Sequence, residues 1–443
     1  MKKMYVGFVK KDIGGLTDMS DKICPLVYTG IATDPSGGVR PCCVFDQKYN
    51  YRGSIAEYKD SKIWKEVEKD FLDGKYHPGC HHCERQDSAG SSSKRTREVQ
   101  NYKAKYNRDT LDIEHMKSIG YDLIDLRLSN KCNLKCVSCN PKSSSLIFDE
   151  TKKHYDDTMH HYKHIYDLAK DRDLTNPYSD ENIEDLMNCI SKDSRLYFTG
   201  GEPSVVKGVL KILQRLIDEG LNKDVDIEFN SNFQTTNPKF IDLLSHFPRG
   251  LMMPSLDGIG ARAEYIRFPS DWKRISDNMK YFNEKCPTWR FNIAPTISVL
   301  SIFYLDELLD FCYHNDYFIN FTNMLWGPGY LNIAILPDKY KQLALQKLEH
   351  AQDKYKQLAF SIFDDINRHA MPISKSADQK RGTTDWAGNI RGLDNLRNYL
   401  YSADSDLERL KACKINLEKL DKVRGNSYIK SLPILKEMFD ECL

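Results

Sequence analysis

The alternation of strand and helix between Asp122 and Leu336 is the feature that most constrains the fold of this chain. Short β-branched and aromatic runs are separated by segments whose apolar residues recur at helical spacing, as in Val205–Glu219. Alternating elements of this kind indicate an α/β fold, a parallel sheet with right-handed crossovers. The predicted strands are 123–128, 195–199, 225–229, 251–256, 291–299 and 317–325, and further predicted helices are 271–284 and 305–314.

A cysteine loop follows the first predicted strand. It reads Cys132-Asn-Leu-Lys-Cys136-Val-Ser-Cys139, with no fourth cysteine nearby. A closed structural zinc site needs four ligands, and a cubane iron–sulfur cluster is normally held by four thiolates. Three local thiolates therefore favour a cluster with one iron open to a ligand that is not protein, which indicates catalysis. A zinc site completed by a distant ligand is the alternative.

Small polar residues end the next three predicted strands. They are Thr199-Gly-Gly-Glu-Pro203, then Asn230-Ser-Asn232, then Ser255-Leu-Asp-Gly258. Active sites in parallel α/β folds gather at the carboxyl ends of strands, and paired glycines let the backbone approach a ligand closely. A metal cluster and a polar ligand are therefore expected at the edge of the sheet where the carboxyl ends of these strands lie.

The cysteine loop together with Gly200-Gly-Glu-Pro203 resembles the radical S-adenosylmethionine (SAM) superfamily, and Ser255-Leu-Asp-Gly258 resembles its fourth strand end. The resemblance implies a partial (β/α)6 TIM barrel. It also implies a [4Fe–4S] cluster on the three cysteines, with SAM on the open iron. Ser138 departs from the family, many of whose members have an aromatic residue there. The implied residues are Cys132, Cys136 and Cys139 for iron, Gly200, Gly201 and Glu202 for the SAM amino group, and Ser231, Asn232, Ser255 and Asp257 for its carboxylate or ribose.

The N-terminal hundred residues contain a second cysteine set. A strand pair, 25–33 and 39–43, is predicted around the turn Asp34-Pro-Ser-Gly-Gly38, and a helix over Ser61–Leu72. The spacing resembles the twitch and SPASM modules of the same superfamily, here placed before the barrel. That resemblance implies an auxiliary [4Fe–4S] cluster, in which Cys43 is the alternative to Cys42 as a ligand. A structural zinc knuckle is the alternative to an iron–sulfur cluster. The implied ligands are Cys24, Cys42, Cys80 and Cys83.

Four regions are expected along the 443 residues. A twitch-like α+β domain covers 1–100, a linker 101–121, the barrel 122–336 and a helical C-terminal region 337–443. A long polar segment, about 141–193, is predicted to be a helical insertion in the barrel. The ending Leu420-Asp-Lys-Val-Arg-Gly425 resembles the tail of a twitch-type radical SAM group.

Net charge, hydrophobicity and cysteine content exclude further classes of protein. The formal net charge is +1, which argues against a dominant nucleic-acid surface. No apolar run approaches the ~20 residues of a membrane helix, and the start lacks a signal-peptide pattern. Without a signal, the clustered CxxC-type spacings among the 13 cysteines indicate metal ligands in a reducing cytoplasm. Three charged residues follow the fourth predicted strand: Arg262, Glu264 and Arg267. One interpretation is that they contact SAM or the substrate, and the other is that they form an ion network on the surface.

The resemblance implies reductive cleavage of SAM to a 5′-deoxyadenosyl radical that removes hydrogen from a substrate. A peptide or protein substrate is favoured, because twitch and SPASM modules accompany peptide maturation, and a small molecule such as a sugar, nucleoside or cyclitol is the alternative. An electron donor such as flavodoxin or ferredoxin would be the partner. A zinc-stabilised nucleic-acid-binding protein is the rival from another class. No catalytic acid or base can be selected from the sequence.

Overall fold

The computed structural model describes residues 22–88, 92–235, 237–315, 317–319, 321, 323–351, 353, 393 and 396–443. One eight-stranded sheet organises them, in the order β2-β1-β3-β4-β5-β6-β7-β8. Every neighbouring pair from β1 to β8 is parallel, and only β2 is antiparallel, to β1. The strands are Gly30–Asp34 (β1), Gly38–Arg40 (β2), Leu123–Leu126 (β3), Arg195–Phe198 (β4), Asp226–Ser231 (β5), Leu251–Pro254 (β6), Arg290–Ile293 (β7) and Phe318–Ile319 (β8).

The six predicted barrel strands are confirmed as β3 to β8, and they are parallel as the strand–helix alternation requires. The predicted crossover helices are also present, as α9 (Lys207–Asp218), α12 (Trp272–Lys285) and α13 (Leu305–His314). Two further helices, α10 (Pro238–Ser245) and α11 (Gly260–Ile266), complete the run. The last two strands are shorter than predicted, although Ile297 and Met324 beyond them still pair in parallel as an isolated bridge.

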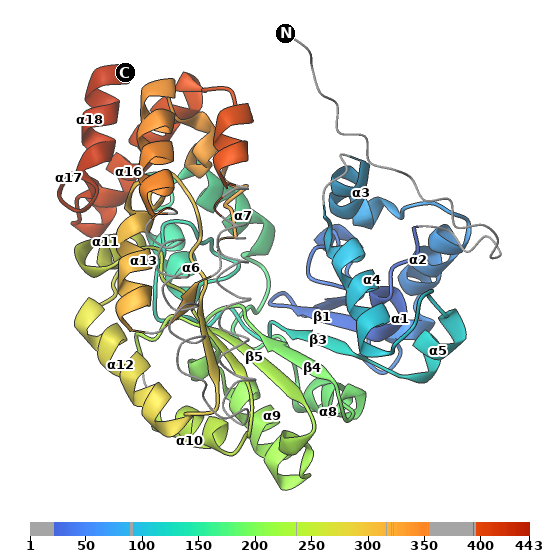
Figure 1. Ribbon diagram of the computed structural model, residues 1–443. Helices are drawn as coiled ribbons and strands as arrows, with labels where there is room; N and C mark the ends of the chain where they lie inside the picture. Colours follow the sequence, from blue (N-terminus) through green and yellow to red (C-terminus); the bar gives the residue numbers. More distant parts are fainter. Residues whose placement is uncertain are drawn as a thin grey trace, which may run out of the picture.

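The N-terminal region joins the barrel sheet at its β1 edge. β1 pairs with β3 through Ile31 and Ile124, so the sheet continues across the boundary expected near residue 100. The predicted hairpin forms as β1 and β2, but Leu26–Thr29 is a helical turn (α1) where strand was predicted. Figure 1 shows this region, in blue, beside the sheet. Its helices are α2 (Lys62–Leu72), α3 (His81–Ser88), α4 (Lys94–Lys105) and α5 (Ile113–Ser118).

Burial alternates along the central strands, because successive side chains point to opposite faces of a sheet. Apolar residues such as Leu126, Phe198 and Phe229 are buried on one face and form the core with the crossover helices. The residues between them, such as Tyr197 and Asn230, are half-buried and polar. The opposite face of the sheet is therefore a polar wall.

Helices above the strand ends frame the cysteine loop. The predicted insertion is helical, as α6 (Ser145–Lys153), α7 (His160–Ala169) and α8 (Asp180–Cys189). The C-terminal region is helical where it is described: residues 338–351 and 396–402, then α16 (Leu407–Arg424), α17 (Tyr428–Ser431) and α18 (Pro433–Cys442). In Figure 1 the last three lie beside α6, α7 and α11. Among the described residues, no helix is long and apolar enough to cross a membrane.

Candidate functional site

The three cysteines of the predicted cluster lie on the loop between β3 and α6. Ser144 caps α6 through the Ile147 N–H at 3.2 Å and donates its hydroxyl to the Leu134 carbonyl at 2.7 Å. The Val137 N–H donates to the Ile266 carbonyl at 2.8 Å. The loop is therefore tied both to its own following helix and to the end of α11. Its thiols are those of Cys132, Cys136 and Cys139.

The glycines at the end of β4 lie directly against this loop. Gly200 and Gly201 both have positive φ, +77° and +27°. A Cβ atom on Gly201 would lie 2.2 Å from the carbonyl oxygen of Lys131, and the Glu202 N–H donates to that oxygen at 2.8 Å. Because Lys131 precedes Cys132, the glycines set the position of the first cysteine.

Glu202 joins the ends of β4 and β5. Its buried carboxylate accepts hydrogen bonds from the hydroxyls of Ser204 at 2.8 Å and Ser231 at 2.9 Å and from the Asn232 N–H at 2.8 Å. Burial raises the pKa of Glu202, although these donors favour its charged form. Glu202 thus fixes the strand ends against each other as well as carrying a charge toward the cysteine loop.

The other predicted SAM residues gather at the same edge of the sheet. The Asn232 side-chain amide donates to Asn133 Oδ1 at 2.7 Å, and its Nδ2 lies 4.0 Å from Cys132 Sγ. The Ser255 N–H donates to the Ser231 carbonyl at 2.8 Å. The ends of β4, β5 and β6 therefore converge beside the cysteine loop, as their parallel pairing dictates.

Asp257 and Arg267 form a buried pair behind the loop. Arg267 Nη2 donates to Asp257 Oδ1 at 3.0 Å, and the Thr296 N–H donates to the same oxygen at 2.6 Å. Arg267 Nη1 lies 3.8 Å from Cys136 Sγ. Of the two roles left open for Arg267, the surface network does not apply, because its side chain is buried. Arg262 instead pairs with Glu307 at 2.8 Å.

The chemistry of the thiols fits a bound iron cluster. Burial raises the pKa of Cys132 well above its ordinary value and that of Cys139 to about 12, because a buried thiolate lacks solvent. A cationic metal centre supplies the missing compensation and binds the thiolate outright. Within the described part of the chain, no three His, Cys, Asp or Glu side chains are arranged to hold one metal ion. That finding concerns single ions, since a four-iron cluster bridges thiols that lie further apart.

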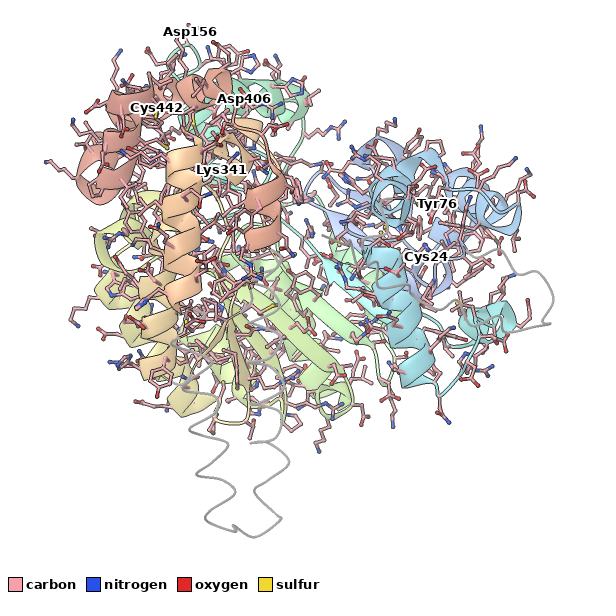
Figure 2. The ribbon with its side chains drawn as sticks, turned by 45° about the horizontal axis from the view of Figure 1, so that its top comes forward. Cys24, Tyr76, Asp156, Lys341, Asp406 and Cys442 are labelled. Carbon is pink, nitrogen blue, oxygen red and sulfur yellow. The ribbon has the colours of Figure 1, made fainter. Side chains whose placement is uncertain are left out.

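The N-terminal cysteines meet around a single cavity. Cys24 precedes α1, Cys42 follows β2, Cys80 ends a 3₁₀ turn and Cys83 lies on α3, and all four line the cavity. Figure 2 labels Cys24 and Tyr76 in this region. Burial raises the pKa of Cys24 to about 12. The remaining lining residues are Val44, Phe45, Phe71, Tyr76, Lys94 and Arg95.

Cys43, the ambiguous neighbour, is not among the residues that line this cavity. Burial is the main cause of its raised pKa, and the charges with the largest effect on it are Asp125, which raises it, and Arg127, which lowers it. The structure therefore brings together the four predicted cysteines around one cavity and leaves Cys43 outside its lining.

The polar wall contains functional candidates that the sequence analysis missed. Arg127 Nε donates to Asp125 Oδ1 at 3.1 Å, and the Tyr197 hydroxyl donates to Asn230 Oδ1 at 3.2 Å. Arg127 keeps 30% of its side chain exposed, so part of its guanidinium side chain remains accessible on this wall. A Cβ atom on Gly200 would contact it at 3.1 Å. The sequence signal that could have revealed these candidates is the alternation of polar residues with fully buried apolar residues along the strands. The polar residues are Asp125, Arg127, Tyr197, Glu228 and Asn230.

Comparison with known proteins identifies the domain. Residues 126–312 match the family model described as the Radical SAM superfamily. The match contains the three loop cysteines, the Gly-Gly-Glu segment and the strand ends that follow. This part of the chain is therefore similar to the radical SAM superfamily, whose cofactors are a [4Fe–4S] cluster and SAM. A search of curated proteins found no match.

Solved structures resemble the chain only distantly. One, a histidine-tagged anSMEcpe with bound AdoMet, is 15% identical with a TM-score of 0.37, covering 55% of this chain and 61% of its own. Another, Streptococcus suis SuiB bound to the precursor peptide SuiA, is 16% identical with a TM-score of 0.32, covering 74% and 68%. The chain thus spans less than two thirds of the length of the first of these structures.

Proposed function

We propose that this enzyme oxidatively modifies a peptide or protein side chain by radical chemistry. The observation that carries the proposal is the presence of two thiol sets on one sheet. Three thiols lie beside a glycine strand end that approaches the cysteine loop more closely than any side chain would allow, and four thiols surround a cavity of their own. The first set suits an open cluster that starts a radical reaction, and the second suits a closed cluster that accepts an electron afterwards.

The ligand sets follow from this placement. Cys132, Cys136 and Cys139 hold the first [4Fe–4S] cluster, and SAM lies against the strand ends that carry Gly200 and Glu202. When bound, these groups supply one electron and a 5′-deoxyadenosyl radical that removes a hydrogen atom from the substrate. A second [4Fe–4S] cluster is held by Cys24, Cys42, Cys80 and Cys83.

The protein side chains position the reactants. The backbone at Gly201 keeps the β4 end against Lys131, which fixes the distance between the SAM site and the cysteine loop. Glu202 offers a carboxylate to the ammonium group of SAM while its other bonds hold the strand ends. Buried strand ends exclude water from the radical, which would otherwise be quenched by side reactions.

The substrate is placed on the polar wall. Arg127 packs beside Gly200, where an added Cβ atom would lie 3.1 Å from its own Cβ, and its charge also acts on Cys43, the neighbour of the auxiliary ligand Cys42. A molecule on this wall would lie between the two thiol sets. Its hydrogen atom would go to the radical, while its remaining unpaired electron would pass to the auxiliary cluster and a proton would leave, a net two-electron oxidation.

A peptide is the proposed substrate because twitch and SPASM modules, which the N-terminal cysteine set resembles, accompany peptide maturation. One observation favours the second candidate, a small polar molecule. The Asp125–Arg127 pair, Tyr197 and Asn230 offer several donors and acceptors within a short distance, as recognition of a sugar or nucleoside requires. We place the enzyme in the cytoplasm, with a flavodoxin or ferredoxin as electron donor.

Iron analysis tests the cluster assignment. Anaerobically reconstituted protein should be brown and bind roughly eight irons, four for each cubane. The triple variant C132A/C136A/C139A should bind roughly four and should no longer release 5′-deoxyadenosine from SAM after reduction by dithionite. Colourless, zinc-loaded protein, or SAM cleavage that survives in the triple variant, would overturn the proposal.

Size fractionation separates the two substrates. Cell extract is divided by mass, and each fraction is added to the reduced enzyme with SAM. A peptide substrate should raise 5′-deoxyadenosine release in the macromolecular fraction, and this gain should disappear after protease treatment. Stimulation confined to the small-molecule fraction would support the second candidate instead.

A further inference from the structure

The C-terminal helix α16 ends against the cysteine loop. Arg424 occupies its last turn, and Nε and Nη2 of its guanidinium donate to Glu150 Oε1 at 3.0 and 2.8 Å. The two side chains are only 2% and 5% exposed, so this ion pair is fully enclosed. Glu150 lies on α6, the helix that follows the loop. A residue near the end of the chain thus reaches the predicted cluster site.

Glu150 shares its charge with the loop itself. Its second oxygen, Oε2, accepts from Lys135 Nζ at 2.6 Å, and Lys135 directly precedes Cys136. The Lys135 N–H also donates to the Phe268 carbonyl at 2.5 Å, and both Lys135 and Arg424 lie over the Phe268 ring. Arg424 therefore acts on the loop through one bridging carboxylate and one shared aromatic ring.

The same helix holds the other elements around the loop. Asp421 accepts from the Tyr265 hydroxyl at 2.9 Å, and Tyr265 lies on α11, whose next residue, Ile266, bonds Val137 of the loop. Asn416 accepts from the His160 N–H at 3.4 Å at the start of α7. Figure 2 shows Asp156 of the insertion at the same end of the molecule as Asp406 and Cys442 of the C-terminal region. Helix α16 thus contacts α6, α7 and α11.

Positive charge also accumulates beside the cysteine loop. Arg424 and Lys135 share a single carboxylate, so the three groups carry one net positive charge next to the loop. The Arg267–Asp257 pair on the other side of Cys136 is neutral. Three thiolates and an iron cluster form an anionic centre, which one nearby uncompensated cation stabilises.

We propose that Arg424 is a positioning residue for the radical cluster, and that α16 is a strap that holds the cysteine loop in its iron-binding arrangement. The guanidinium fixes Glu150, Glu150 fixes Lys135, and Lys135 fixes the backbone at Cys136. The inference rests on the proposed assignment of Cys132, Cys136 and Cys139 to iron. It gives the Leu420–Gly425 segment, which the radical chemistry itself does not use, a role in building the site.

The test compares R424Q with K422Q. Lys422 lies on the same helix and pairs with Asp157 at 3.5 Å, but it is 76% exposed, so its loss changes charge without touching the loop. After anaerobic reconstitution, R424Q should lose at least half of the iron bound at the loop while keeping the irons of the N-terminal set. The electron paramagnetic resonance signal that responds to SAM should fall in proportion, and the remaining loop cluster should have a more negative midpoint potential. K422Q should match the parent protein in all three measurements.

E150Q is the second variant, because R424Q removes one of the two cations that pair with the buried Glu150 carboxylate, which can impair folding. Its amide has the same shape, so the selective loss of loop iron should recur. Full iron and an unchanged SAM-responsive signal in folded R424Q or folded E150Q would overturn the role of Arg424. The triple variant C132A/C136A/C139A distinguishes the two failures: if it keeps all its iron, the ligand assignment is wrong, and if it loses four irons while R424Q loses none, only the strap is wrong.

Discussion

Replacing Gly201 by alanine should damage the SAM site far more than replacing Gly220. Both glycines have positive φ, +27° and +73°, which costs an L-residue about 1–2 kcal/mol. They differ in what a Cβ atom would meet. At Gly220 nothing lies within 4 Å, whereas at Gly201 the carbonyl oxygen of Lys131 lies 2.2 Å away. Gly220 is therefore a matched control for backbone conformation alone.

The contact at Gly201 can be relieved only by moving backbone. The Cβ···O distance must open from 2.2 Å to at least 3.0 Å, and the hydrogen bond from Glu202 to Lys131 is lost in the process. That bond is worth about 0.5–1.5 kcal/mol. Together with the conformational cost, G201A should destabilise the protein by about 2–3 kcal/mol, and G220A by about 1–2 kcal/mol.

Thermal unfolding of the apo-protein under reducing, anaerobic conditions measures the first effect. A domain of this size loses about 2–4 °C for each kcal/mol, so G201A should melt about 4–12 °C below the parent. The functional effect should be larger, because Cys132 follows Lys131 and a misplacement of ~1 Å can cost ~10²-fold in rate. Reductive SAM cleavage should therefore fall by roughly 100-fold in G201A and change little in G220A. Equal melting points and equal cleavage rates in the two variants would refute the close approach of β4 to the loop.

Two further predictions concern the N-terminal region. C42A should lose roughly four irons after reconstitution, whereas C43A should keep them, because only Cys42 lines the four-thiol cavity; the reverse result would exchange the two assignments. Burial alone would raise the pKa of Glu98, but Lys94 and Arg195, each 2.8 Å away, hold it at about 2 against an ordinary 4.5. This depressed pKa makes Glu98 stabilising by roughly 3 kcal/mol above pH ~4.5, and the contribution is lost as the pH falls toward 2. Urea unfolding of apo E98Q should show a lower free energy of unfolding than the parent at about pH 6, and this free energy should fall less steeply as the pH is lowered. A fall as steep as that of the parent would contradict the depressed pKa of Glu98.

Local pattern was sufficient to predict the barrel. Each strand from β3 to β6 is a short segment with buried apolar residues, flanked by polar turns, and each crossover helix has apolar residues at helical spacing, so both signals lie within a few residues. The site motifs were predictable for the same reason. Cys132, Cys136 and Cys139 are adjacent in sequence, and parallel pairing alone brings Glu202 and Asn232 to their edge.

Other features depend on pairings that no local pattern records. The parallel pairing of β1 with β3 joins segments about ninety residues apart, and the residues of β1 would suit any sheet edge equally well. The turn at Leu26–Thr29 was mistaken for strand, because its β-branched and aromatic residues favour strands while burial against α2 and α5 selects a helical turn.

The cluster loop illustrates why sequence motifs define a ligand set without defining a working site. The cysteines themselves need only eight residues, but the backbone around Cys136 is held by Ile266 of α11 and, through Lys135 and Glu150, by Arg424 of α16. Removing one partner from a buried ion pair typically costs ~3–5 kcal/mol, which is comparable to the free energy that holds a loop in one conformation. Iron loading should therefore depend on segments that lie far from the motif in sequence, and a fragment that ends before α16 should bind iron poorly at the loop even though it contains all three ligands.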